Sequence, residues 1–239
     1  MPEADSGVVA ALDVDSVDAL KRLVELTTDV DGIVAYKLGI AGVLRLGLPG
    51  AVRAIREISD LPIVYDHQKA GLDIPDMARR FSAVCHEAGV DSLILFPLGG
   101  PGAVREFVCQ ARQVGLVPVV GGALPFDEYS VSGGGYVADD ALDRILAAAL
   151  GHGAADFVLP AHDHALVGRH SRFLREHIDR PGLFLPGIGP LGGSIAKAFA
   201  AAPGCRRYAV VGRAITAADD PREAARRLGG QALAAATKD

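Results

Sequence analysis

Short apolar runs alternate with longer amphipathic segments along the whole chain. The runs are rich in Val, Ile and Leu and lack a regular polar alternation, which is typical of strands buried on both faces of a parallel sheet. They predict eight strands, at Val8–Val14, Gly32–Gly39, Pro62–His67, Ser92–Pro97, Val117–Leu124, Asp156–Ala161, Leu183–Gly189 and Tyr208–Thr216.

The segments between these runs predict helices. Apolar residues recur three and four positions apart in Pro101–Val114 and Asp139–Leu150. Ser16–Thr27 opens on a capping serine, and Asp219–Leu228 carries a proline near its first turn. Eight strand–helix alternations in 239 residues favour one (β/α)8 TIM barrel domain over residues 1–239. An open, doubly wound sheet is the alternative.

Polar residues interrupt or follow the predicted strands where a barrel enzyme places its catalytic groups, at the C-terminal strand ends. These residues are Asp13, Lys37, Asp66, Lys69, Asp73, His162, Gly187–Gly189, Gly212 and Arg213. A lysine is almost never buried unpaired, so Lys37 implies a carboxylate partner or a ligand. Lys69 lies between Asp66 and Asp73, which favours its protonated form and lets it deliver a proton to a carbanion.

Glycine-rich turns follow the last two predicted strands. Their exposed N–H groups, together with an arginine, are typical of the phosphate site that many barrels carry at this position. The candidate phosphate ligands are Pro186, Gly187, Gly189, Gly192, Gly212 and Arg213.

Two other segments have candidate functions. Pro125–Val137 is long, polar and glycine-rich, which is typical either of a lid over a site or of a plain surface excursion. His162, Asp163 and His164, with Asp66 and His67, leave a zinc or iron site open as an alternative, because imidazole and carboxylate are ligands for both metals.

Composition and charge argue against some classes of binding partner. The net charge is −5, from 24 basic and 29 acidic residues, and the absence of a basic block argues against nucleic-acid binding. The sequence contains no run of about 18 apolar residues, so it predicts no membrane span. Residues 1–7 lack the apolar core of a signal peptide. The three cysteines, Cys85, Cys109 and Cys205, have no metal-ligand spacing and are expected to be reduced and buried. We therefore expect a cytoplasmic protein.

Several of these motifs occur together in an order that resembles the orotidine 5′-monophosphate decarboxylase family. They are Ala-Leu-Asp ending at Asp13, Lys-x-Gly at Lys37, the run from Lys69 to Asp73-Ile74-Pro75, Pro186-Gly187-Ile188-Gly189 with Gly192-Gly193, and Val211-Gly212-Arg213. The similarity spans about Val8 to Leu228.

The resemblance implies a homodimeric barrel that decarboxylates orotidine monophosphate to UMP without cofactor or metal. It implies that Asp13 holds a ribose hydroxyl, that Lys37 binds the ribose within the charge array, and that Asp66 presses against the substrate carboxylate. Lys69 would protonate C6, Asp73 would come from the partner subunit, and Ile74 would contact substrate. Arg213 and the backbone at Gly212 would bind phosphate.

The sequence departs from the family pattern at three places. The interval from Asp66 to Lys69 and that from Lys69 to Asp73 are each one residue longer than usual, so either a bulge absorbs the difference or His67 takes the place of the first carboxylate. Ala123-Leu124-Pro125-Phe126 has no hydroxyl where the family reads the pyrimidine, although Ser130 and Ser132 follow. Leu191 stands where the family has a glutamine.

These departures keep other hypotheses open. One is a diverged homologue that acts on another phosphorylated, carboxylated nucleotide or sugar acid. Another is a silent barrel that binds a nucleotide as a regulator, and a third is a metal-dependent phosphosugar epimerase or aldolase.

Overall fold

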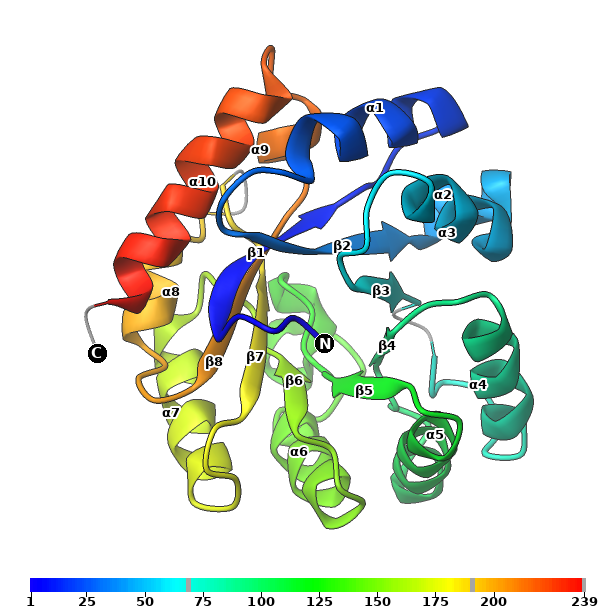
Figure 1. Cartoon of the computed structure of the whole chain (residues 1–239). Coiled ribbons are helices and arrows are strands. Elements are labelled where there is room, and N and C mark those ends of the chain that lie inside the picture. The colour runs from blue at the N-terminus through cyan, green and yellow to red at the C-terminus, as the bar shows by residue number, and fades with distance from the viewer. Residues whose placement is uncertain (68–69, 190–191, 238–239) are drawn as a thin grey trace.

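Eight parallel strands form a closed barrel in a computed structural model that describes residues 1–67, 70–189 and 192–237. Each strand pairs with its neighbour in sequence, and β8 pairs with β1 to close the ring. Figure 1 shows the helices arranged around this ring. The predicted TIM barrel is confirmed.

The strands are short, and most are joined by one helix. They are β1 Ser6–Ala11, β2 Ile33–Gly39, β3 Ile63–Asp66, β4 Ser92–Leu95, β5 Val117–Val120, β6 Asp156–Val158, β7 Gly182–Pro186 and β8 Arg206–Val211. The α-helices are α1 Val17–Thr27, α2 Ile40–Leu46, α3 Leu48–Arg56, α4 Met77–Glu87, α5 Pro101–Gln113, α6 Ala141–Gly151, α7 His164–Arg175, α8 Ile195–Ala200, α9 Arg213–Thr216 and α10 Pro221–Ala236. Two 3-10 turns, η1 Asp127–Tyr129 and η2 Val131–Gly133, lie between β5 and α6.

Two apolar layers explain why the strands lack polar alternation. One face of each strand packs against the helices in the larger core cluster, and the other face fills the barrel interior. The interior cluster contains Val64, Ile94, Val158, Phe184 and Tyr208. Every second strand residue therefore points inward, and the same alternation carries Lys37 and Asp66 to the inner face at the C-terminal end.

Several predicted bounds were wrong. The strand expected at Tyr208–Thr216 ends at Val211, because Arg213–Thr216 forms the short helix α9. Gly187–Gly189, expected within a strand, forms a loop after β7. Ser16 caps α1 as predicted, by accepting a hydrogen bond from the Ala19 N–H at 3.2 Å. Asp220 caps α10 by accepting a hydrogen bond from the Glu223 N–H at 3.0 Å.

An ion pair closes the N-terminal end of the barrel. Asp156, at the start of β6, accepts a hydrogen bond from Arg206 Nη2 at 2.9 Å, across Gly182 of the intervening strand β7. A Cβ at Gly182 would overlap Asp156 Oδ1, so this position requires glycine. The first residues of the chain cross this end (Figure 1), where the Ala4 carbonyl accepts from Tyr208 Oη at 3.0 Å.

None of the described helices is long and apolar enough to cross a membrane.

Candidate active site

A lysine held between two carboxylates lies at the C-terminal end of the barrel. Lys37 Nζ is 3.0 Å from Asp66 Oδ2 and 3.4 Å from Asp13 Oδ1. The side chains of Lys37 and Asp66 are only 10% and 12% exposed, whereas that of Asp13 is 47% exposed. The prediction that Lys37 has a carboxylate partner or a ligand is confirmed for the carboxylate.

The array formed by Asp13, Lys37 and Asp66 contains a buried polar atom without a hydrogen bond to another described residue. Asp66 Oδ1 is buried and has no hydrogen-bond partner among residues 1–67, 70–189 and 192–237. A buried carboxylate oxygen without a partner costs stability, so its persistence favours a role with a ligand over a structural one.

Gly39 allows the carboxylate of Asp13 to approach the lysine. A Cβ at this position would overlap Asp13 Oδ1 and lie 3.2 Å from Lys37 Nζ. Any side chain here would push apart the β1 and β2 ends of the array. The Lys-x-Gly spacing was visible in the sequence, but its steric reason was not.

Two cavities open on this array and share all three of its charged residues. The larger, of about 530 Å³, extends toward the ends of β4 and β5 and has apolar walls that include Phe96, Leu98 and Leu124. The smaller, of about 180 Å³, extends toward β7 and β8. A ligand spanning both would place its middle at the lysine.

The predicted phosphate ligands lie on the smaller cavity only in part. Pro186, Gly187 and Gly212 line it, whereas Gly189, Gly192 and Arg213 do not. Gly187, Gly189 and Gly192 all have positive φ, which explains the glycines of this turn.

The N–H groups of the turn are not all available to a ligand. Gly189 N–H donates to the Gly193 carbonyl at 3.0 Å, and Gly192 N–H donates to the Gly189 carbonyl at 2.8 Å. The expectation of exposed donors therefore does not hold at these two residues in this structure. Arg213 is exposed at the start of α9, and Leu191 lies outside the described residues.

Asp66 and His67, at the end of β3, point their side chains to opposite faces of the barrel wall. Asp66 faces the lysine, whereas His67 Nδ1 lies 2.7 Å from the Tyr65 hydroxyl and the His67 ring packs near Phe81 of α4. Asp66, rather than His67, therefore lies beside Lys37, because consecutive strand side chains turn to opposite faces. The place of His67 relative to Lys69 stays a prediction. Lys69, the predicted proton donor, lies outside the described residues.

Asp73 and Ile74 lie away from the array of Asp13, Lys37 and Asp66. Both are exposed, and Asp73 Oδ1 accepts a hydrogen bond from the Ile74 N–H at 2.7 Å. Neither lines the cavities around Lys37.

The segment after β5 does reach the site, through a residue that sequence reasoning missed. Tyr129 of η1 lines the larger cavity, and its hydroxyl donates to the Gly122 carbonyl at 2.6 Å. Burial raises the pKa of this phenol. A lone tyrosine in a polar loop gave no sequence signal of this contact.

The two serines of this segment point elsewhere. Ser132 Oγ donates to Asp139 Oδ1 at 2.6 Å and lies 3.2 Å from Ser130 Oγ. The hydrogen bonds that Ser132 donates through its hydroxyl and its N–H lower the pKa of Asp139. Neither serine lines the cavity beside Lys37, so neither replaces the missing hydroxyl in this structure.

The histidines after β6 do not gather around a common point. Asp163 caps α7 by accepting from the Leu166 N–H at 2.9 Å, and His162 is exposed beside a neighbouring cavity. Among residues 1–67, 70–189 and 192–237, no three His, Cys, Asp or Glu side chains are placed to hold a metal ion.

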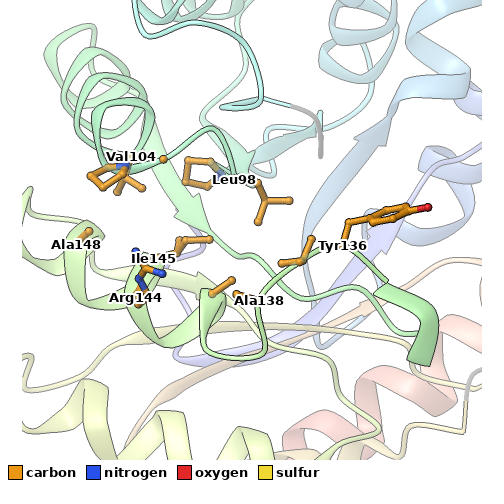
Figure 2. A pocket seen from close by; sticks show the side chains of 12 residues that line it. Leu98, Val104, Tyr136, Ala138, Arg144, Ile145 and Ala148 are labelled. Carbon is orange, nitrogen blue, oxygen red and sulfur yellow. The ribbon is translucent and has the colours of Figure 1, made fainter. Parts of the chain in front are cut away.

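An apolar pocket lies outside the array, between α5 and α6. Figure 2 shows its lining, with Val104 of α5 facing Ile145 and Ala148 of α6, and with Leu98 beside them. Tyr136 lies at its edge, and its ring extends away from these side chains (Figure 2) and is fully exposed. Leu98 also lines the cavity beside Lys37, so the two cavities are neighbours.

Comparison with known proteins agrees with the fold and with the family resemblance. The profile of the "Orotidine 5'-phosphate decarboxylase / HUMPS family" matches residues 6–228. The orotidine 5'-phosphate decarboxylase of Methanosarcina barkeri is 30% identical over 227 residues, covering 95% of this chain and 94% of the relative. That of Thermococcus kodakarensis is 27% identical over 225 residues, covering 94% and 95%.

Solved structures give the same result. The orotidine 5'-phosphate decarboxylase of Pyrococcus horikoshii superposes with a TM-score of 0.74 at 25% identity, covering 94% of this chain and 98% of that one. The enzyme of Methanocaldococcus jannaschii, in complex with the inhibitor BMP, has a TM-score of 0.77 at 21% identity and covers 94% and 97%. The chain therefore belongs to the orotidine 5'-phosphate decarboxylase / HUMPS family.

Proposed function

We propose that this protein decarboxylates orotidine 5′-monophosphate to UMP without a cofactor. The observation that carries the proposal is the ammonium of Lys37, held 3.0 Å from Asp66 and 3.4 Å from Asp13 where two cavities meet. A preplaced cation between carboxylates stabilises negative charge that develops on a substrate at low cost in reorganisation.

In this proposal the phosphate lies toward β7 and β8, and the pyrimidine lies toward β4 and β5. Gly212, Gly187 and Pro186 line the phosphate end. Arg213, exposed at the start of α9 and outside the lining of this cavity, is proposed to bind the phosphate. Gly189 and Gly192 contribute by shaping the turn, because their own N–H groups are already bonded within it. Asp13 and Lys37 bind the ribose between the two ends.

The chemical step needs a carboxylate, a cation and a proton donor. Asp66, one oxygen of which has no partner among the described residues, lies beside the carboxylate of the substrate and disfavours its bound ground state. The bond from C6 to the carboxylate carbon breaks, CO₂ leaves, and the electron pair stays on C6. The ammonium of Lys69 gives its proton to C6, and the lysine regains a proton from water.

The proposal includes a homodimer. Asp73 and Ile74 are exposed and lie away from the array of Asp13, Lys37 and Asp66, which suits the contribution of Asp73 to the site of a partner subunit. A cytoplasmic location is also part of the proposal.

The test is turnover of orotidine 5′-monophosphate by the purified protein, followed by CO₂ release. Lys69→Ala should lower kcat by at least ~10³-fold, because the proton donor is removed. Lys21→Ala is the matched control, because Lys21 pairs with Glu57 on the surface and should leave turnover unchanged. Full activity of Lys69→Ala would contradict the role of Lys69, and no CO₂ release by the wild type would contradict the function.

A second candidate is a homologue that acts on another phosphorylated, carboxylated compound. The apolar wall of Phe96, Leu98 and Leu124 favours it, because it carries no side-chain hydrogen-bonding group to read a pyrimidine edge. Assay of orotidine 5′-monophosphate against phosphorylated sugar acids separates the two. A higher kcat/KM for a sugar acid would support the second candidate.

A further inference from the structure

The larger cavity beside Lys37 ends at a partition. Leu124 and Tyr129 line this cavity of about 530 Å³, and they also line a neighbouring cavity of about 240 Å³. The neighbouring cavity is polar, with Asp143, His162 and Arg169 on its wall. The two side chains therefore separate the space around the lysine from a second space behind it.

Tyr129 is held in this partition at its hydroxyl and at its ring. The hydroxyl donates to the Gly122 carbonyl at 2.6 Å, at the end of β5. The ring meets Phe126 edge-on, with centroids 5.9 Å apart. Because burial raises the pKa of the phenol, the hydroxyl keeps its proton and remains a donor at neutral pH and above.

The loop that carries Tyr129 is also fixed on its far side. Val131 N–H donates to the Val137 carbonyl at 2.8 Å, and Ser132 Oγ donates to Asp139 Oδ1 at 2.6 Å. The loop is therefore closed on itself beyond the partition, and the position of the ring does not depend on one contact.

The partition lies on the path of a bound ligand because the phosphate end, Lys37 and the apolar wall follow one another along the two cavities. If phosphate lies toward Gly187 and Gly212, a ligand that passes Lys37 directs its ring toward Phe96 and Tyr129. Phe96 and Leu124 provide apolar contact for such a ring, and Tyr129 lies between it and the neighbouring cavity.

We propose that Tyr129 limits the size of the ring that the substrate carries, and that its removal joins the two cavities. This inference rests on the proposed function, because it needs a phosphorylated ligand that spans both cavities. The specificity-determining feature is the aromatic ring itself. The hydroxyl is a positioning group that holds the ring against Gly122.

The test compares binding of UMP with binding of UMP analogues enlarged at C4, at C5 or at N3, measured by calorimetry. Tyr129→Ala should improve the affinity for at least one enlarged analogue relative to UMP by about 10-fold or more, the range expected for a change of one or a few methylene volumes in an apolar pocket. The analogue that gains shows which ring edge faces Tyr129.

Two further variants distinguish an effect of the Tyr129 ring from an effect of the loop that carries it. Tyr129→Phe keeps the ring, so its preference for UMP over the enlarged analogues should stay within about 3-fold of the wild type, although its affinities fall together. Tyr136→Ala removes a fully exposed tyrosine from the same loop that does not line the cavity beside Lys37, and it should bind like the wild type.

Each outcome decides the matter. Unchanged selectivity in Tyr129→Ala, while the wild type binds UMP and decarboxylates orotidine 5′-monophosphate, overturns this inference and leaves the proposed function standing. A similar gain in Tyr136→Ala also overturns it, because the effect would then come from the loop in general. Absence of UMP binding by the wild type overturns the proposed function and this inference together.

Discussion

The two ends of the barrel each bury a charged pair, and the pairs differ in how completely their hydrogen bonds are met. At the N-terminal end Asp156 accepts from Arg206 at 2.9 Å, and Arg206 Nε also donates to the Arg180 carbonyl at 3.2 Å. At the C-terminal end Lys37 lies between Asp66 and Asp13, and Asp66 Oδ1 has no partner in the part of the chain that the structure describes.

The difference agrees with the general roles of the two ends of a TIM barrel. Groups at the N-terminal end of a barrel contribute stability, and groups at the C-terminal end carry chemistry. A satisfied pair needs nothing more, whereas a buried carboxylate oxygen without a partner can accept a ligand. Two cavities also open on Lys37.

The largest expected effect follows from removing the cation at the C-terminal end. Lys37→Met keeps the apolar stem and removes the ammonium, so kcat/KM for orotidine 5′-monophosphate should fall by at least ~10³-fold. Steady-state kinetics measures this, with Lys21→Met as the surface control. Activity within 10-fold of the wild type would show that the array is not catalytic.

Breaking the Asp156–Arg206 pair at the N-terminal end should lower stability and leave activity unchanged. Arg206→Ala leaves the buried Asp156 carboxylate without its counter-charge, so the free energy of unfolding should fall by about 3 kcal/mol while kcat stays unchanged. Urea unfolding measures the loss. Arg180→Ala is the matched control, because the Arg180–Asp5 pair is about half exposed and its removal should cost less than ~1 kcal/mol.

The pair at the N-terminal end should also give stability a pH dependence. Burial raises the pKa of Asp156, and this effect outweighs the opposing charge of Arg206. Between the unfolded pKa, about 3.9, and the raised folded value, the folded state binds more protons than the unfolded chain, so the contribution of this group falls as pH rises through that window.

Asp156→Asn removes this titration. The free energy of unfolding of the wild type, minus that of the variant, should therefore decrease as pH rises from about 4 toward neutral, by at most ~1.4 kcal/mol per pH unit. Urea unfolding of both proteins at a series of pH values measures the difference. A difference that rises with pH would show that Arg206, rather than burial, controls the carboxyl group.

The sequence predicted the barrel and the polar strand ends because both follow from local periodicity. Lys37 and Asp66 share an inward face since strand residues alternate, and their meeting followed from the rule that parallel strands end at one rim. Tyr129 could not be predicted, because its place depends on the path of a loop and on one hydrogen bond to Gly122. The bonding of Gly189 and Gly192 within their own turn depends on loop geometry in the same way.

The pair at the N-terminal end shows another limit of sequence reasoning. Asp156, Gly182 and Arg206 are far apart in sequence and share a level only because β6, β7 and β8 pair in register. The glycine between the two charged side chains had no separate signal, because the requirement arises from the side chains on its two neighbours.

The most direct test of the contrast between the two ends is Asp66→Asn, with kcat/KM and the free energy of unfolding measured on the same preparation. Asparagine keeps the shape and an oxygen for Lys37, and it removes the charge from a buried group that lacks a full set of partners. We predict that kcat/KM falls by at least ~10²-fold while the free energy of unfolding stays the same or rises. Retained activity together with a loss of stability would contradict the account.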